Sequence, residues 1–177
     1  MDFVFTVFLI IPVLGLLFFA LSLLYFSYTG PLFVPTPKNI SENTFSKIKI
    51  NQGDLVVDLG CGDGRVLEYL AKKYQTKGLG VEINPFLYLI ALVKSKLKKI
   101  KNVKYVRGDF LKTNLSAANI VYFYAIPKYL PGIIKKVDSE CKKGTIVISQ
   151  RFAVKDWENK MFFKEIRKSN STFIYKI

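Results

Sequence analysis

A run of alternating glycines, DLGCGDG at Asp58–Gly64, constrains the fold of this chain more than any other feature. It follows the apolar segment LVV, which is typical of a buried strand, and precedes RVLEYLAKKYQ, whose apolar residues recur at helical spacing. Glycines between a strand and a helix let a ligand lie against the backbone, while the first N–H groups of the helix face its polar end. The sequence therefore predicts a small-molecule site at a strand-to-helix turn.

The remainder of the chain alternates between predicted strands and predicted helices. The strands are expected at residues 54–60, 77–83, 103–109, 119–126 and 144–152, and residues 162–168 and 171–177 are expected to form a hairpin. The helices are expected at 63–75, with Asp63 as N-cap, at 85–99, and at 128–140, where Pro131-Gly132 weakens the pattern. This order predicts an α/β fold, a largely parallel sheet covered on both faces, with its active site beyond the carboxyl ends of the strands.

The amino-terminal segment is apolar from Phe3 to Tyr25, apart from Thr6 and Ser22. About 20 such residues can span a membrane as a helix, so we expect a transmembrane anchor at residues 1–28. A cleaved signal peptide and a buried core helix are the alternatives. Residues 29–50 are then a juxtamembrane linker with a short lead-in helix, starting at Ser41 or Asn43, and residues 51–177 form the domain. Lysines follow the span, which predicts a cytoplasmic domain on a single-pass membrane protein.

The amino-acid composition limits the classes of ligand and of site that are expected. There are 27 Lys+Arg against 13 Asp+Glu, a net charge of +14, and only four of the basic residues are arginines. Lysine excess fits attraction to polyanions such as an anionic membrane leaflet, or reflects codon usage, while few arginines argue against nucleic-acid recognition. The chain has no histidine, and Cys61 and Cys141 are far apart, so neither a metal site nor a disulfide framework is expected.

The charge of the glycine run points to the class of ligand. Its third glycine comes one position earlier than in a dinucleotide motif, and Asp58 would repel a pyrophosphate but attract a cation. S-adenosylmethionine carries a sulfonium and an ammonium group and has no phosphate. Glu82 is placed to accept hydrogen bonds from its ribose and Asp109 from its adenine, with Phe110 beside the ring. The structural alternatives are a plain glycine turn, a solvated acid for Glu82 and a helix cap for Asp109.

The motifs VVDLGCGDGR, GVEINP and RGDF, in this order, resemble those of the class I S-adenosylmethionine-dependent methyltransferases. With the further segments FVPTP, VEINPFL and YAIP taken into account, the chain looks like a member of the ATP synthase c-subunit lysine methyltransferase family and its membrane-anchored relatives. The resemblance implies a Rossmann-like, seven-strand-type sheet and methylation of lysines on membrane proteins, including the ADP/ATP carrier and the c-subunit. The compact, lysine-rich domain favours a prokaryotic cell membrane over a mitochondrial one.

The resemblance also implies which residues form the site. A segment ahead of the domain, at Pro35 and Thr36, is expected to close over the cofactor. Related amino-methylating enzymes carry an Asn/Asp-Pro-Pro-aromatic motif where this chain has Tyr124-Ala125-Ile126-Pro127, which disfavours glutamine, adenine or ring-nitrogen acceptors. The predicted cofactor residues are Pro35, Thr36, Asp58, Leu59, Gly60, Cys61, Gly62, Gly64, Glu82, Ile83, Asn84, Asp109 and Phe110.

The acceptor side is predicted at Tyr122, Tyr124 and Pro127. The two tyrosine rings would line a channel as cation–π partners, unless both are simply core aromatics. An acceptor lysine loses its proton more readily when desolvated, so a strong base is not required. The sequence therefore predicts a protein-lysine N-methyltransferase. The alternatives are a methyltransferase for a lipid, quinone or other small molecule, one for nucleic acid, and a non-catalytic cofactor-binding module.

Overall fold

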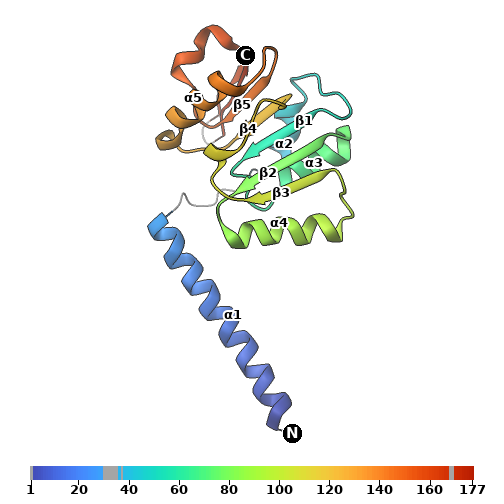
Figure 1. The fold of residues 1–177 in the computed structure, drawn as a ribbon, viewed down its shortest axis with the longest axis vertical. Helices are drawn as coiled ribbons and strands as arrows, with labels where there is room; N and C mark the ends of the chain where they lie inside the picture. Colours follow the sequence, from blue (N-terminus) through green and yellow to red (C-terminus); the bar gives the residue numbers. More distant parts are fainter. Residues whose placement is uncertain (1, 30–35, 37, 168–169) are drawn as a thin grey trace. The chain divides into compact units, whose positions relative to one another are not determined.

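The computed structural model describes residues 2–29, 36, 38–167 and 170–177 and divides the chain into two units, Met1–Val34 and Pro35–Ile177 (Figure 1). The first unit contains α1 (Asp2–Thr29), with Pro12 inside it. Over the residues that the structure describes, no helix meets the length and apolarity of a membrane span. The segment predicted as an anchor at residues 1–28 is therefore helical over its described residues, but a transmembrane span is not supported there. The predicted domain boundaries, after residues 28 and 50, stay predictions.

The second unit is built on one seven-stranded sheet in the order β3-β2-β1-β4-β5-β7-β6. β1 to β5 run parallel, and β7 is antiparallel to both of its neighbours, β5 and β6. The predicted α/β sheet with an antiparallel carboxy-terminal hairpin is therefore confirmed. The strands are β1 (Leu55–Leu59), β2 (Lys77–Glu82), β3 (Val103–Arg107), β4 (Ile120–Phe123), β5 (Ile146–Gln150), β6 (Met161–Glu165) and β7 (Thr172–Lys176).

Helices cover both faces of the sheet. Alternate residues of each strand point to opposite sides, and β1 has apolar side chains on both sides that lie in a core. Val56 of β1 belongs to a core that includes Leu67 and Ala91, whereas its neighbour Val57 belongs to a second core with Ile133 and Trp157. The helices are α2 (Lys38–Phe45), α3 (Arg65–Tyr74), α4 (Pro85–Leu97) and α5 (Leu130–Glu140), with 3-10 turns η1 (Phe110–Lys112), η2 (Pro127–Tyr129) and η3 (Lys155–Lys160).

Three predicted helix details are wrong. The N-cap of α3 is Gly64, because Asp63 turns its carboxylate to Arg65 and Lys94 instead. Pro131 does not weaken α5, since it lies in the first turn, where its missing N–H has no intrahelical partner to lose. The lead-in helix α2 starts at Lys38 and ends at Phe45, where fully buried Phe45 packs against Tyr122.

Candidate functional site

The glycine run adopts a conformation that only glycines hold without strain. Gly60, Gly62 and Gly64 have φ of 87°, 56° and 78°, in the left-handed region. The N–H groups of Gly60 and Cys61 both donate to the Val81 carbonyl of β2, at 2.9 and 3.0 Å. A Cβ added at Gly60 would meet no atom within 4 Å. The hydrogen bonds to β2 therefore fix the position of the loop, and the space beside Gly60 stays open, as a cofactor-binding loop requires.

Gly64 serves a different purpose, which is close packing. A Cβ at Gly64 would lie within 2.7 Å of Cζ of Tyr105, a residue of β3 whose hydroxyl hydrogen bonds to the Gly64 carbonyl. The start of α3 thus lies directly against the Tyr105 ring, so Gly64 allows the helix to pack closely on β3. No local pattern indicated that Tyr105, 41 residues away, would be its partner.

We expect Gly64→Ala to destabilise the domain more than Gly53→Ala. Gly53 has a similar φ of 83° but no atom within 4 Å of its added Cβ, so its substitution isolates the backbone cost of about 1–2 kcal/mol. At Gly64 the overlap with Tyr105 adds a further cost of about 1–3 kcal/mol. Urea unfolding of both variants measures the difference, and equal losses would contradict the packing role.

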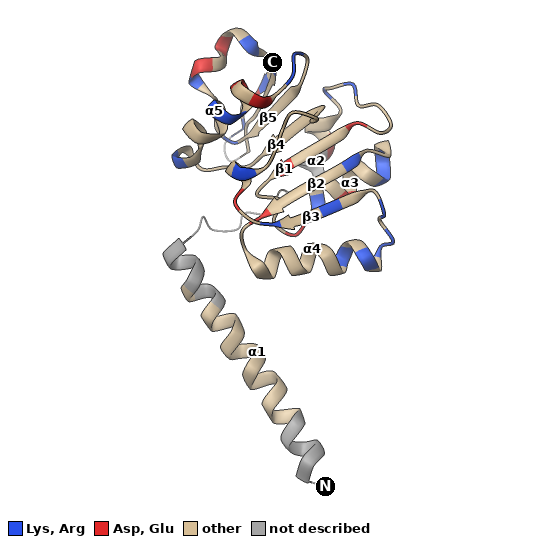
Figure 2. Ribbon diagram, viewed as in Figure 1, with Lys and Arg blue, Asp and Glu red and all other residues tan. Residues whose placement is uncertain are grey.

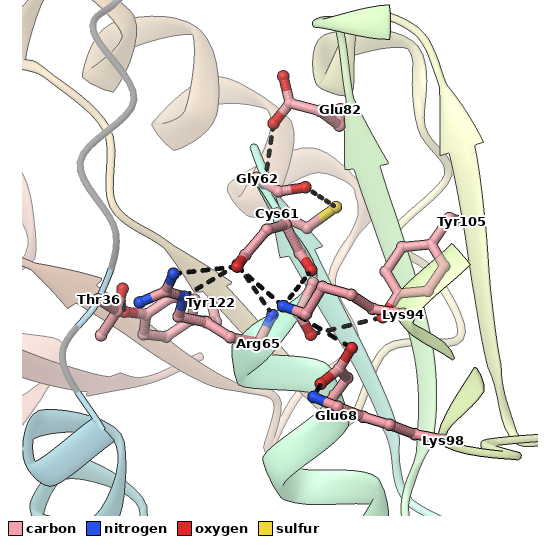
Figure 3. Close-up of polar contacts among 12 residues, drawn as sticks. Thr36, Cys61, Gly62, Arg65, Glu68, Glu82, Lys94, Lys98, Tyr105 and Tyr122 are labelled. Carbon is pink, nitrogen blue, oxygen red and sulfur yellow. Dashed lines mark hydrogen bonds and ion pairs between the residues drawn. The ribbon is translucent and has the colours of Figure 1, made fainter. Parts of the chain in front are cut away.

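Glu82, at the end of β2, ties the glycine loop to the next helix. Its Oε2 accepts the Gly62 N–H at 2.8 Å (Figure 3). Its Oε1 accepts the Asn84 N–H, also at 2.8 Å. Burial raises the pKa of Glu82, although the hydrogen bonds from Asn84 and Gly62 partly lower it. An ionised carboxylate offers about four lone-pair positions, so two stay available for ribose hydroxyls. Glu82 therefore has both a structural role and the capacity for its predicted binding role.

Asp58 is the second acid of the site, and it lies in β1 with only 2% of its surface exposed. Burial, followed by repulsion from Glu82 and Asp63, raises the pKa of Asp58 well above its usual value of 3.8. A buried carboxylate that is repelled by other carboxylates is stabilised in its ionised form by a bound cation. The site thus fits a positively charged ligand and disfavours a phosphate.

Asp63 is neutralised within the protein. Burial alone would raise its pKa, but hydrogen bonds from Arg65 and Lys94 outweigh burial and lower the pKa to about 2. Lys94 of α4 donates to the Asp63 carboxylate at 2.8 Å and to its backbone carbonyl at 3.1 Å. Lys94 also lies 3.9 Å from Glu68 of α3, which pairs with Lys98. This network fastens the loop to α4, and sequence analysis missed it because its members are about 30 residues apart.

Lys94→Met is expected to cost roughly 1–2 kcal/mol of stability at pH 7, because a charged hydrogen bond to Asp63 is lost. The folded pKa of Asp63 is depressed, so its stabilising effect is present above pH 3.8 and is lost as the pH falls through about 2. The difference between variant and wild type should therefore shrink over that window. Denaturant unfolding across pH measures it, with exposed Lys96→Met as the matched control.

The predicted acceptor residue Tyr122 lies beside Asp58. The two are paired in register on neighbouring strands β1 and β4, so their side chains share one face of the sheet. The Tyr122 hydroxyl is 3.1 Å from Thr36 Oγ1, and both side chains are buried. Burial raises the pKa of Tyr122, which therefore stays a neutral phenol at physiological pH. Thr36 thus lies beside Tyr122, its role toward the cofactor stays a prediction, and Pro35 lies outside the described residues.

Tyr124 and Pro127 follow the end of β4. Tyr124 is partly exposed, and its hydroxyl lies 3.3 Å from Asn170 Oδ1. Pro127 is exposed and opens the turn η2. Tyr122 and Tyr124 therefore differ in exposure to solvent: Tyr122 is packed in a core with Phe45, whereas Tyr124 is partly exposed. Their roles toward an acceptor stay predictions.

The other predicted cofactor residues are distributed around the strand ends. Asp109 accepts the Leu111 N–H at 2.9 Å and caps η1, and the Phe110 ring packs edge-on against Tyr129, a contact that sequence analysis missed. Asn84 caps α4 by accepting from Phe86 and Leu87. The remaining three differ in exposure: Leu59 and Cys61 are buried and Ile83 is half exposed.

Comparison with known proteins agrees with this geometry. The family described as ANTKMT methyltransferase domain matches residues 58–161. A protein-lysine N-methyltransferase of Saccharolobus islandicus is 32% identical over 134 residues, which are 75% of this chain and 83% of that protein. The lysine N-methyltransferase of the ATP synthase c-subunit from Rattus norvegicus is 29% identical over 126 residues, which are 71% of this chain but only 57% of the rat protein.

Among solved structures, an RNA methyltransferase from Salinibacter ruber in complex with S-adenosyl-L-homocysteine superposes with a TM-score of 0.77. It is 26% identical in sequence, and the match covers 81% of this chain and 94% of that one. The family match extends from the glycine run to the start of β6, and so includes Asp58, Glu82 and Asp109. The chain therefore belongs to the ANTKMT methyltransferase domain family and is an S-adenosylmethionine-dependent methyltransferase.

Proposed function

We propose that this methyltransferase modifies lysine side chains and that its acceptors are membrane-associated proteins. The observation that carries the proposal is the buried pair Asp58 and Glu82 beside an open glycine loop, a site with the charge and space for a cationic methyl donor. The names of the similar archaeal and rat proteins support lysine as the acceptor. The resemblance to the c-subunit methyltransferases supports a membrane-associated target.

The donor would be held by residues at the carboxyl ends of β1, β2 and β3. Asp58 would face the positive groups, Glu82 would accept the ribose hydroxyls, and Asp109 with Phe110 would hold the adenine. The open space at Gly60 leaves room for the ligand against the backbone. When bound, S-adenosylmethionine supplies a methyl group that the sulfonium makes electrophilic. The protein then contributes alignment and a site that excludes water.

The acceptor amine must arrive without its proton. A lysine starts with a pKa near 10.4, and transfer into an apolar channel lowers that value. The raised pKa of Tyr122 means that its hydroxyl is a neutral hydrogen-bonding group and not a base at neutral pH. Since the chain has no histidine, we propose that solvent takes the proton before the amine passes Tyr124. The tyrosine faces would then orient the amine toward the methyl group.

The test is to incubate the purified full-length protein with methyl-labelled S-adenosylmethionine and membranes of the organism that encodes it. Protein, lipid and nucleic acid are then separated, and labelled protein is hydrolysed to identify methyl-lysine. Label in a membrane protein, absent with Asp58→Asn and present with exposed Asp156→Asn, is the expected result. Label in methylated residues other than lysine would contradict the proposal.

Two other acceptor classes are outcomes of the same experiment. The Salinibacter ruber structure is named an RNA methyltransferase, so label that nuclease removes would assign the activity to RNA. Label in the lipid extract would assign it to a lipid or quinone. Tight cofactor binding with no label in any fraction would favour a non-catalytic module.

A further inference from the structure

Helix α4 carries an apolar stripe on its outer side. Ala91 and Ser95 are buried against the sheet, as expected for a covering helix. On the other side, four large apolar side chains recur at helical spacing, and each is roughly half exposed or more: Leu89 at 54%, Ile90 at 45%, Val93 at 48% and Leu97 at 77%. At about 100° per residue, this stripe is centred nearly opposite the buried side. α4 is therefore apolar on two faces, of which the domain covers one.

The stripe is accompanied by positive charge. From Ile83 to Gly108 the sequence contains seven basic residues and no acidic one. Lys94 and Lys98 turn back to Asp63 and Glu68, whereas Lys96, Lys99 and Lys101 are exposed and form no ion pair with any described residue. Figure 2 shows this charge at the carboxyl end of α4 and on β3, beside an uncharged amino-terminal part of the helix.

The three unpaired lysines surround a groove of about 430 Å³ between the end of α4 and the start of β3. Its lining includes Leu92, Ile100, Lys96, Lys99 and Lys101. Apolar walls with ammonium groups around them suit a molecule that has an anionic headgroup and an apolar tail.

We propose that α4 is a docking surface for an anionic lipid membrane, with the stripe entering the interface and Lys96, Lys99 and Lys101 contacting lipid headgroups. Charge complementarity selects this occupant: an amphipathic face with lysines beside apolar side chains binds the boundary between headgroups and acyl chains. A nucleic acid would use the lysines but would leave the apolar stripe exposed to water. An acidic protein partner would need no groove for an apolar tail.

The position of α4 links this surface to the cofactor site. Asn84, the N-cap of α4, is only two residues beyond Glu82, and half-exposed Ile83 lies between them. β3, which packs against α4, is the edge strand of the sheet, and exposed Val106 lies near its carboxyl end. A domain that docks through α4 therefore brings the rim of its site close to the lipid surface, independently of which acceptor it methylates.

The test uses the full chain in a Cys141→Ser background, with Leu97→Cys carrying an environment-sensitive fluorophore; Cys61 is buried. Ile166→Cys, 73% exposed on the carboxy-terminal side, is the matched control. Vesicles contain phosphatidylcholine alone or with phosphatidylserine. We expect a blue shift at position 97 that requires phosphatidylserine and weakens with salt, and no shift at position 166.

The combined change Lys96→Glu, Lys99→Glu and Lys101→Glu should weaken this lipid contact on the order of 100-fold or more, because each lysine near an anionic leaflet contributes roughly fivefold. The control Lys142→Glu with Lys143→Glu, also exposed, should keep the blue shift, and both variants should retain cofactor binding. Equal shifts at both probes, or no shift with phosphatidylserine, would overturn the proposal. A shift that needs only higher protein concentration would assign the stripe to a second copy of the chain.

Discussion

Asp58→Asn is expected to weaken S-adenosylmethionine binding by at least about 30-fold and, at the same time, to raise the stability of the ligand-free domain at pH 7. Removing one charge of a buried, charge-assisted contact costs about 2 kcal/mol or more of binding free energy, which is the stated factor. The stability gain follows because burial and repulsion from Glu82 and Asp63 make ionised Asp58 unfavourable without a ligand.

The pH dependence of the two effects has opposite signs. The folded pKa of Asp58 is raised, so the ligand-free wild type becomes more stable as the pH falls from above that raised pKa toward 3.8. Cofactor affinity should fall over the same window, since a cation favours the ionised carboxylate. Asp58→Asn should remove the contribution of Asp58 to the pH dependence of both stability and cofactor affinity.

Thermal unfolding and titration calorimetry, each repeated across pH, measure stability and affinity separately. Asp156→Asn changes the same chemical group at an exposed position and should alter neither. A ligand-free Asp58→Asn variant that is less stable than wild type would mean that the Asp58 carboxylate holds the sheet together. In that case the ionised Asp58 carboxylate would not destabilise the ligand-free domain, contrary to the prediction.

Most of the fold could be predicted because its signals are local. The central strands β1, β4 and β5 are short, largely apolar segments, and the glycine run marks the first strand-to-helix turn. The alternation of strand and helix patterns alone therefore indicated a parallel sheet with a final hairpin. The N-cap of α3 could not be predicted in this way. Asp63 has the right chemistry for a cap, but Lys94, 31 residues further on, provides a stronger partner for its carboxylate.

The acidic residues of the candidate site could be predicted from the sequence, whereas most contacts within the site could not. Asp58 was identified because it opens the glycine run and Glu82 because it ends the next predicted strand, and the structure places both in buried positions on adjacent strands. The hydrogen bond of Tyr122 to Thr36 and the contact of Tyr105 with Gly64 join residues 86 and 41 positions apart. Such pairs depend on strand order and register, which no local pattern encodes.

Glu82→Ala is expected to lose cofactor binding as Asp58→Asn does, but with the opposite effect on stability. The substitution leaves the buried N–H groups of Gly62 and Asn84 without their acceptor. Each unsatisfied group costs about 1–3 kcal/mol, so the loss of both acceptors should cost the ligand-free domain about 2–6 kcal/mol. Removal of a buried carboxylate whose pKa is raised offsets part of that loss.

Glu82→Gln separates the two roles of the side chain. Its amide oxygen can still accept one of the two N–H groups, while its NH₂ group cannot accept the other. Stability by urea unfolding should therefore follow the order wild type, Glu82→Gln, Glu82→Ala, with exposed Glu158→Ala close to wild type as the control.

Affinity should not follow that order. Both Glu82 variants lose an ionised acceptor for the ribose hydroxyls, so both should bind S-adenosylmethionine at least about tenfold more weakly in calorimetry. If Glu82→Gln binds normally but is destabilised, Glu82 only supports the loop and the ribose must be held elsewhere. If it is stable but does not bind, the hydrogen bonds to Gly62 and Asn84 contribute little, and Glu82 acts on the cofactor alone. Loss of both stability and affinity is the result expected of a carboxylate that shapes the glycine loop with two of its lone pairs and binds the cofactor with the others.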